Sequence, residues 1–257
     1  VIHFSPSVKA EPKTWTVDDD GPPADFSKIQ EAINAASPGD TIRVFDGIYP
    51  EWNLVLNKDN LSLIGENKDN TIIDGMNLGW VLIITAKNVT VTGFTIQKSS
   101  IGTAGIFLNH AIGSKIRNNI IENHDSGIYS AFSNGNVIEN NWVTNNNEGI
   151  ILSMVSKENK IRNNNVTNNT LFAGIDLANG AHDNEIENNN IVQNTYGIWI
   201  SFDNNSIFGN QIVNNDVGIY EDPESLGYKI FHNNFINNTK QIDLSGQSVN
   251  VWDNGLE

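Results

Sequence analysis

The chain contains no cysteine, only three arginines and no long apolar run, and each of these absences excludes something. Without cysteine there are no disulfides, and the redox compartment cannot be inferred from thiols. A membrane-spanning helix needs about 18 consecutive apolar residues, and no segment here reaches that length. The formal net charge of -15 would repel phosphates, so we expect no nucleic-acid partner.

The chain does contain enough apolar residues for a folded core. Hydrophobic residues make up 39% of the 257 residues and charged residues only 18%, which is too apolar for a disordered protein. The acidic surface would also repel an acidic polysaccharide unless a basic cleft or a bound cation intervened. No cofactor is certain from the sequence, and Ca²⁺ is the one that it leaves open.

The first residues are consistent with export. The chain begins with valine, and Val8, Lys9 and Ala10 place small residues at the spacing of a signal-peptidase site. We therefore expect a secreted, periplasmic or cell-surface protein, although a chain cut at an arbitrary point explains the same residues.

The dipeptide Gly-Ile recurs six times, at intervals of 22, 22, 25, 23 and 21 residues. Between these dipeptides, an isoleucine is followed by an asparagine three residues later and by an apolar residue two positions after that. Apolar residues separated by two predict short strands rather than helices. The dipeptides begin at Gly105, Gly127, Gly149, Gly174, Gly197 and Gly218; the asparagines are Asn119, Asn141, Asn164, Asn189, Asn210 and Asn233; a second set follows near the next turn at Asn123, Asn145, Asn168, Asn194, Asn214 and Asn237.

Short strands joined by Asn and Gly corners, in cycles of roughly this length, predict a right-handed parallel β-helix, an all-β solenoid of about ten coils. Each coil should lie about 4.8 Å above the last, so that the apolar residues stack inside. Leucine-rich repeats have a similar length but need leucines where this chain has Ile, Val and polar residues. We expect the asparagines to form a ladder, since Asn tolerates the left-handed backbone of a corner and stacked amides hydrogen-bond to each other.

The first 40 residues have a different pattern. Ser27 and Gln30 have the spacing of a capping box, and apolar residues follow at helical spacing up to Pro38-Gly39. We predict a short helix of about ten residues that covers the first coil, whose apolar end would otherwise be open. Strands are expected at 41–45, 61–65, 71–74, 81–85 and 89–96. The predicted organisation is a single domain, 1–257, with a capping segment at 1–40, irregular coils at 41–104, regular coils at 105–245 and a C-terminal end at 246–257.

The segments TWTVDDDGPPADFSKIQEAINAASPGDTIRVFDGIYPEW and LSLIGENKDNTIIDG, together with the repeats, resemble the pectin-lyase-like superfamily. They are most similar to archaeal and bacterial NosD-type parallel β-helix repeat proteins. The resemblance covers nearly the whole chain and implies the fold, but the superfamily hosts lyases, hydrolases, esterases, epimerases and proteins with no known chemistry. NosD-type proteins are linked to periplasmic copper-site maturation. Copper prefers His, Met or Cys, and the two methionines and five scattered histidines here do not support copper binding.

The catalytic motifs of the enzymatic branches are largely missing. The Gly-Ile-Tyr-Pro-Glu segment at 47–51 resembles pectin methylesterases, but their later catalytic segments are absent, as are the motifs of polygalacturonases and pectate lyases. Alginate epimerases and related lyases carry Gly-Phe-Asp-Pro-His, of which Gly174 and Asp176 match while the proline and histidine do not. Epimerase chemistry is therefore in doubt, because that histidine acts as an acid or base.

If Ile and Leu of each Gly-Ile-x-Leu strand face inward, the residue between them faces outward. An outward stripe of aromatics with one carboxylate suits sugar rings, which stack on aromatic faces and hydrogen-bond to nearby polar groups. Plain stacking of like side chains between coils explains the same stripe. This column comprises Phe107, Tyr129, Ile151, Asp176, Trp199 and Tyr220, and the next comprises Asn109, Ala131, Ser153, Ala178, Ser201 and Asp222. The predicted substrate-binding residues are Phe107, Tyr129, Trp199, Tyr220 and Asp222.

Asp176 is the candidate catalytic residue, because a carboxyl group beside aromatic neighbours can have a raised pKa. His182, on the turn that follows, is a second candidate, although a His-Asp pair on a turn is more often solvated. The run Asp18-Asp19-Asp20 could bind a cation, but adjacent exposed carboxylates are more often merely solvated, and we predict no metal ligands. Glu221, Asp222 and Glu224 around Pro223 have the same interpretation.

Two functional hypotheses follow. One is an exported or cell-surface module that binds a polysaccharide or glycan without catalysis, with self-association by end stacking as a further option. The other is a polysaccharide lyase or C5-epimerase acting on uronate polymers through Asp176. A convergent set of acid, base and cation would favour the enzyme, and only fragments of such a set are present, so the sequence favours the module.

Overall fold

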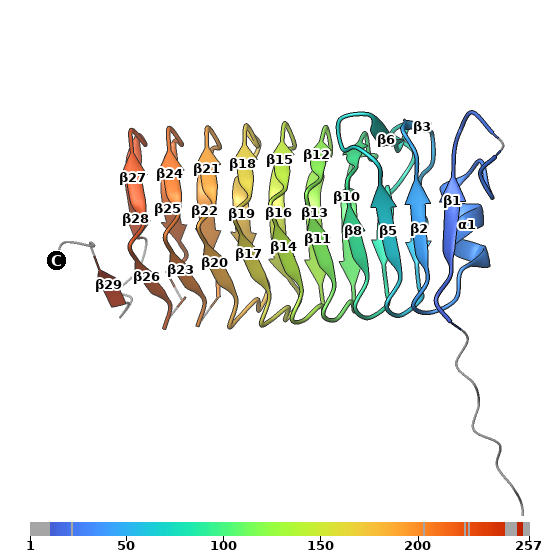
Figure 1. The fold of residues 1–257 in the computed structure, drawn as a ribbon. Coiled ribbons are helices and arrows are strands. Elements are labelled where there is room, and N and C mark those ends of the chain that lie inside the picture. The colour runs from blue at the N-terminus through green and yellow to red at the C-terminus, as the bar shows by residue number, and fades with distance from the viewer. Residues whose placement is uncertain are drawn as a thin grey trace, which may run out of the picture.

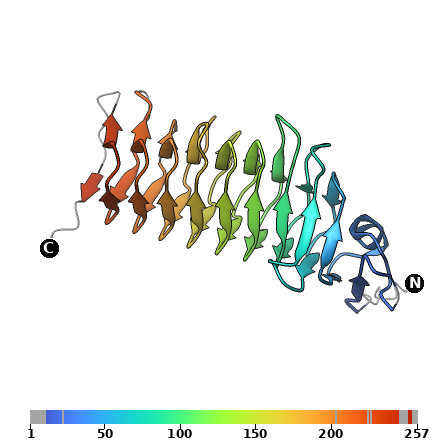
Figure 2. The ribbon, with the colours of Figure 1, turned by 90° about the horizontal axis from the view of Figure 1, so that it is seen from above.

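The computed structural model describes residues 11–21, 23–202, 204–223, 225, 227–244 and 251–253. Val8, Lys9, Ala10, Glu224 and the last four residues lie outside this range, so the expectations placed on them are not addressed. Within it, the chain forms a parallel β-solenoid of about ten coils, as predicted, with three parallel sheets along its length (Figure 1). Seen from above, the coils follow one another in a single row (Figure 2).

From β2 on, successive coils contribute one strand each to sheets A, B and C, so neighbours in a sheet are three strands apart in sequence, whereas β1 pairs directly with β2. Sheet A comprises β1 (Thr14–Val17), β2 (Thr41–Val44), β5 (Ser62–Gly65), β8 (Thr90–Thr92), β11 (Lys115–Arg117), β14 (Val137–Glu139), β17 (Lys160–Arg162), β20 (Glu185–Glu187), β23 (Ser206–Phe208), β26 (Lys229–Phe231) and β29 (Val251–Asp253).

Sheet B lies between sheets A and C along the chain. It comprises β3 (Gly47–Tyr49), β6 (Thr71–Asp74), β9 (Thr95–Gln97), β12 (Ile120–Glu122), β15 (Trp142–Thr144), β18 (Asn165–Thr167), β21 (Asn190–Val192), β24 (Gln211–Val213) and β27 (Asn234–Ile236). Sheet C comprises β4 (Leu54–Leu56), β7 (Leu82–Ile84), β10 (Ala104–Asn109), β13 (Ser126–Ala131), β16 (Glu148–Ser153), β19 (Ala173–Leu177), β22 (Tyr196–Ile200), β25 (Val217–Glu221) and β28 (Lys240–Leu244).

The core consists of apolar files that run the length of the solenoid. In sheet A, Ile116 pairs with Ile138, and Ile138 with Ile161, and all three are fully buried. No single coil could bury these side chains, and stacking in register removes them from water. One predicted strand, 89–96, is wrong as a single element, because the corner at Gly93 (φ 85°) divides it into β8 and β9.

Three files of polar side chains line the corners between the sheets. In the A–B file, the side-chain amide of Asn141 donates to Asn164 Oδ1 (3.1 Å) and to the backbone carbonyl of Ile116 (2.8 Å), and the pattern repeats in the neighbouring coils. These files satisfy the buried backbone groups at each corner. The A–B file comprises Asn119, Asn141, Asn164, Asn189, Asn210 and Asn233; the B–C file His124, Asn146, Asn169, Asn194, Asn215 and Asn238; the C–A file Ser114, Asn136, Asn159, Asn184 and Asn205.

We expected one asparagine at each corner both to adopt the left-handed backbone and to form the stacked hydrogen bonds, but two neighbouring residues divide these roles. Asn163 has the left-handed backbone (φ 54°) and is exposed, whereas Asn164 is buried and makes the hydrogen bonds. The same division displaces most of the second predicted set by one residue: Asn145 and Asn168 are left-handed, and the residues that follow them stack. Asn194 is the exception, because it lies in the B–C file itself and Gln193 is left-handed. A corner thus needs a pair, because the left-handed residue points its side chain away from the file.

The helix α1 (Ile29–Ala35) covers the first coil and buries Ile29, Ala32 and Ile33 against it. The predicted capping box is wrong, since Lys28 is the N-cap and makes no side-chain cap. Instead, Glu51 accepts hydrogen bonds from the backbone N–H groups of Ile29 (2.7 Å) and Gln30 (3.0 Å). A carboxylate 22 residues away in sequence therefore anchors the helix.

The helix also pairs with the solenoid edge. Gln30 Oε1 accepts a hydrogen bond from the backbone N–H of Val55 in β4 (3.1 Å), the first strand of sheet C. An edge N–H that would otherwise be unpaired is thereby satisfied. Within the described residues, no helix has the length and apolar character needed to cross a membrane. The division of the chain into one domain with the four predicted segments stays a prediction.

Candidate functional site

The outer face of sheet C carries the residues that the sequence singled out. Phe107 pairs in register with Tyr129, Tyr129 with Ile151, Ile151 with Asp176, Asp176 with Trp199, and Trp199 with Tyr220. The predicted outward column is therefore one continuous file over six coils. We call it the aromatic file, and it comprises Phe107, Tyr129, Ile151, Asp176, Trp199 and Tyr220.

Two groups of stacked rings flank the middle of the aromatic file. Toward the N-terminal end, Phe107 stacks on Trp80 (centroids 4.3 Å apart) and on Tyr129 (5.4 Å). Toward the C-terminal end, Trp199 lies 3.9 Å from Tyr220 and 4.6 Å from Phe172. Much of each ring face is occupied by a neighbouring ring, so stacking between coils explains part of this pattern.

Tyr196 and Phe172 enlarge the second group of rings and were not predicted. Tyr196 meets Trp199 edge to face at 4.6 Å and lies 5.5 Å from Tyr220. It stands immediately before a Gly-Ile dipeptide, one position outside the segment used to define the outward columns. Extending each strand by that one residue would have revealed Tyr196, and also Glu148, which pairs with Ser126 on the neighbouring strand.

Asp176 lies between the two groups of rings and is 7% exposed. Its Oδ1 atom is buried and has no hydrogen-bond partner in the structure. Burial raises the pKa of Asp176 to about 8, with a smaller contribution from the charges of Glu148 and Asp222. The prediction of a raised pKa agrees with this environment. The carboxyl group is nearly buried, however, and is not exposed as a ligand would be.

Further carboxyl groups surround Asp176. Burial, followed by the charge of Asp125, raises the pKa of the half-buried Glu148. Asp125 accepts hydrogen bonds from the backbone N–H of Gly102 (2.9 Å) and from the side chain of Asn147 (2.6 Å). Asp222 Oδ2 accepts from the indole N–H of Trp199 at 3.3 Å, and Ser201 Oγ accepts from it at 2.8 Å. The centre of this face is thus rich in carboxyl groups.

An open hollow of about 440 Å³ lies beside Trp199, whose indole N–H donates to two of the lining residues, Ser201 and Asp222. It is lined by residues of the second outward column and of the corner that follows, which bring together hydroxyl, amide, carboxylate and aromatic groups. These are the groups that bind sugars in concave sites. The lining residues are Ala178, Asn179, Ser201, Phe202, Asp222 and Pro223. We call this hollow the Trp199 hollow.

His182 lies apart from Asp176. Its Nδ1 is 2.7 Å from Asp183 Oδ2, and no hydrogen bond or ion pair joins it to Asp176. It lines a second hollow, on the corner between sheets C and A, together with Met154 and Lys157. The structure therefore does not bring the two candidate catalytic residues into contact.

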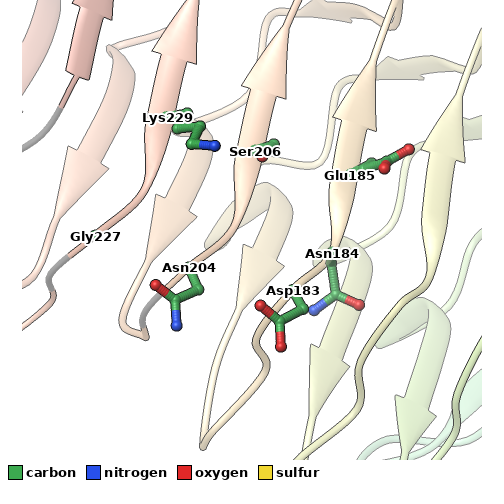
Figure 3. Close-up of a pocket in the computed structure, with 7 residues that line it drawn as sticks. All are labelled: Asp183, Asn184, Glu185, Asn204, Ser206, Gly227 and Lys229. Carbon is green, nitrogen blue, oxygen red and sulfur yellow. The ribbon is translucent and has the colours of Figure 1, made fainter.

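A third hollow, of about 300 Å³, opens at the N-terminal ends of β20, β23 and β26 in sheet A and is drawn in Figure 3. Glu185, Ser206 and Lys229 line it from three successive strands, and Asp183 and Asn204 line it from the corners (Figure 3). It contains both an acid and a base but no aromatic side chain. None of the predicted site residues line it.

The acidic residues that we considered as cation ligands lie elsewhere. Ligand atoms of Asp18, Asp19 and Asp20 lie within 4.8 Å of one another near the N-terminal end. Asp19 Oδ2 accepts a hydrogen bond from the backbone N–H of Ile48 (3.0 Å) and Asp18 Oδ1 from that of Asp20 (3.1 Å), which are structural roles. Glu221 is fully buried on the inner side of β25, so its interpretation as a solvated residue is wrong.

A sequence profile of the family described as "Periplasmic copper-binding protein (NosD)" matches residues 66–256, about three quarters of the chain. Among curated proteins, no sequence matches. The fold is similar to that of ORF18 of Geobacillus virus E2, with a TM-score of 0.62 and 14% identity, over 88% of this chain and 57% of that one.

Two further solved structures with similar folds act on or bind saccharides according to their descriptions. XylC in complex with xylose has a TM-score of 0.73 and 14% identity over 87% of this chain and 66% of its own. The pectate lyase Pel9A has a TM-score of 0.67 and 13% identity over 96% and 79%. The chain thus spans less than two thirds of the virus protein and of XylC. At these identities the likeness shows the fold alone.

Proposed function

Because the chain belongs to the NosD family of periplasmic copper-binding proteins, we propose that it is an exported or cell-surface β-helix module. Its function in this proposal is to bind carbohydrate along the outer face of sheet C, without catalysis of its own. The periplasmic description of the family supports the location.

The single observation that carries the carbohydrate proposal is the Trp199 hollow. Asn179, Ser201 and Asp222 line it with hydrogen-bonding groups, and Phe202 adds an aromatic surface. The hollow has the size and mixed polarity of a site for one or two sugar units. The aromatic file extends the same face over further coils, so that Phe107, Tyr129 and Tyr220 would contact neighbouring units of a chain. The folds of XylC bound to xylose and of a pectate lyase are compatible with this use of the face.

Copper, which the family description implies, is not matched by the donor groups of the described residues. The chain has no cysteine. His124 is buried in the B–C file, where Nδ1 accepts from the backbone N–H of Ser99 (3.0 Å) and Nε2 donates to the Ile96 carbonyl (2.9 Å). His110 bonds to the side chain of Asn109, and His182 to Asp183.

Among the hollows described above, the one beside His182 is lined by two ligand types that copper prefers. Met154 and His182 line it, but the ammonium group of Lys157 lines it too and would repel a cation. Two donors beside a positive charge do not make a copper site. We therefore assign no step of the proposed function to copper.

Binding can be tested by isothermal titration with neutral, acidic and amino oligosaccharides. We expect Trp199→Ala to weaken binding at least tenfold, because its indole N–H holds Ser201 and Asp222, two residues that line the hollow, and its ring packs against Tyr220. Trp142→Ala is the matched control, since Trp142 is 47% exposed on sheet B. Equal affinity of both variants for every ligand would place the binding face elsewhere.

A polysaccharide-active enzyme of the lyase or C5-epimerase type is the second candidate, and the environment of Asp176 favours it. A carboxyl group with a pKa of about 8 is mostly protonated at neutral pH, as a general acid must be. The test is incubation with uronate polymers, with and without Ca²⁺, followed by absorbance of unsaturated uronates and by proton NMR. Product that disappears in Asp176→Asn would support the enzyme, and the absence of any product would support the module.

A further inference from the structure

We propose that the saccharide bound on the outer face of sheet C carries free amino groups, and that this face discriminates against uronate polymers. The inference rests on the proposed function and adds the substrate class. Its first support is the distribution of charge over the three sheets. Along the described strands of sheet C, the only basic residue is Lys240, which forms an ion pair with Asp243 on its own strand (2.5 Å).

Sheet A shows the opposite distribution. Its strands carry six basic residues, among them Lys160 and Arg162, whose side chains pair with glutamates at 2.7 and 2.8 Å. A polyanion approaching the molecule would therefore be drawn to sheet A rather than to the face with the aromatic file. The basic residues are Arg43, Lys115, Arg117, Lys160, Arg162 and Lys229.

The second support is the set of acidic groups at the centre of sheet C. Asp222 lines the Trp199 hollow, and Asp176 and Glu148 lie close enough for their charges to interact. A cation that comes between carboxyl groups whose charges repel one another stabilises their ionised forms. An ammonium group supplies that charge and three hydrogen-bond donors, which the carboxylate of Asp222 can accept because it lines the Trp199 hollow.

The neighbouring side chains favour an organic ammonium over a metal ion. A metal would need several carboxylate oxygens within a few ångströms of one another, and in the described part of the chain only Asp18, Asp19 and Asp20 form such a group. The carboxyl groups of Glu148, Asp176 and Asp222 come from different coils, as the amino groups of a saccharide come from successive sugar units. In the aromatic file Trp199 directly follows Asp176, and Tyr129 is separated from it by Ile151; aromatic rings beside an acidic site add to its attraction for a cation.

The experiment compares three hexasaccharides at pH 6 by isothermal titration: a glucosamine hexamer, the same hexamer fully N-acetylated, and a galacturonate hexamer. The first two have one backbone and differ only in charge. We expect the glucosamine hexamer to bind at least tenfold more tightly than the acetylated one, and the galacturonate hexamer to bind least.

Charge-matched variants separate the site from the general attraction of an acidic protein for a polycation. Glu148→Gln combined with Asp222→Asn removes two charges from the site, and we expect it to weaken glucosamine binding at least tenfold while leaving the acetylated hexamer unchanged. Glu31→Gln combined with Asp69→Asn removes two exposed charges elsewhere and should have less than a twofold effect.

The outcomes distinguish this inference from the proposed function. If the acetylated or galacturonate hexamer binds as tightly as the glucosamine hexamer, and Trp199→Ala abolishes that binding, the amino-group inference is overturned and the binding module stands. Equal losses in the two double variants also overturn it, since the attraction would then be non-specific. If Trp199→Ala changes the affinity for none of the three, the proposed function fails with it.

Discussion

Replacing either of two adjacent asparagines by glycine should have very different effects on stability. Asn164 is buried in the A–B file, and Asn163 is exposed with a left-handed backbone. Asn164 Oδ1 accepts from the backbone N–H (2.9 Å) and the side-chain amide (3.1 Å) of Asn141. Its own amide donates to the Ile138 carbonyl (2.8 Å) and to Asn189 Oδ1 (3.0 Å).

The expected magnitude follows from the groups that Asn164→Gly would leave without partners. Two buried donors of Asn141 lose their acceptor, and each unsatisfied buried donor costs about 1–3 kcal/mol. The free energy of unfolding should therefore fall by about 2–6 kcal/mol. Asn163→Gly keeps every hydrogen bond of the file and places glycine at a left-handed position that suits it, so its effect should stay within about 1 kcal/mol.

Urea unfolding followed by circular dichroism measures the difference between the two variants. Because a solenoid can unfold in parts, hydrogen exchange at the Asn141 amide provides a local measurement. Asn164→Gly should greatly reduce protection of that amide, and Asn163→Gly should leave it almost unchanged. Equal destabilisation of the two variants, or normal protection of Asn141 in Asn164→Gly, would refute the assignment of these roles.

Three further predictions concern titration and capping. His124 is buried, and its pKa is lowered to about 4, mainly by desolvation. The folded state should therefore lose stability as the pH falls from about 6.5 toward 4. The melting temperature of His124→Asn should not show this loss, because asparagine occupies the equivalent position in the neighbouring coils of the B–C file and does not titrate. The raised pKa of Asp176 (about 8) has the opposite effect on the pH dependence of stability. The contribution of Asp176 to the free energy of unfolding is fully favourable below about pH 4 and is lost as the pH rises toward 8. The melting temperature of Asp176→Asn, relative to that of the parent, should therefore increase over that range. Glu51→Gln weakens the cap on α1 and should cost about 1 kcal/mol, with faster hydrogen exchange at Ile29 and Gln30 as the specific sign; unchanged exchange would contradict the capping role.

The fold could be predicted because its determinants are periodic. The Gly-Ile dipeptides and the isoleucine–asparagine spacing specify register, and the pairing of Ile116 with Ile138 and of Tyr129 with Ile151 follows from aligning the cycles. Features fixed by contacts between distant residues could not be read in this way. Glu51 caps a helix that begins 22 residues earlier, and no local pattern indicates this.

The candidate site was predicted in position but not in environment. Counting along the strands placed Asp176 and Trp199 on one outward file, yet the pKa of Asp176 depends on its burial and on charges from other coils, those of Glu148 and Asp222. Glu148 stands immediately before a Gly-Ile dipeptide, in a strand where the simple alternation of buried and exposed positions breaks down. Counting alternate residues fails there, since the consecutive residues Gly149 and Ile150 are both buried.

The corner files also restrict how a molecule of this kind can change in length. Each residue of these files needs a hydrogen-bond partner in the adjacent coil. Insertion of part of a coil would therefore leave side-chain amides without partners, whereas duplication of one whole coil would reproduce every contact. Coils of 21 to 25 residues coexist in this chain, because the additional residues of the longer coils lie outside the files. Descendants of such a sequence should therefore grow or shrink by complete turns, and their outer faces should lengthen in steps of about 4.8 Å.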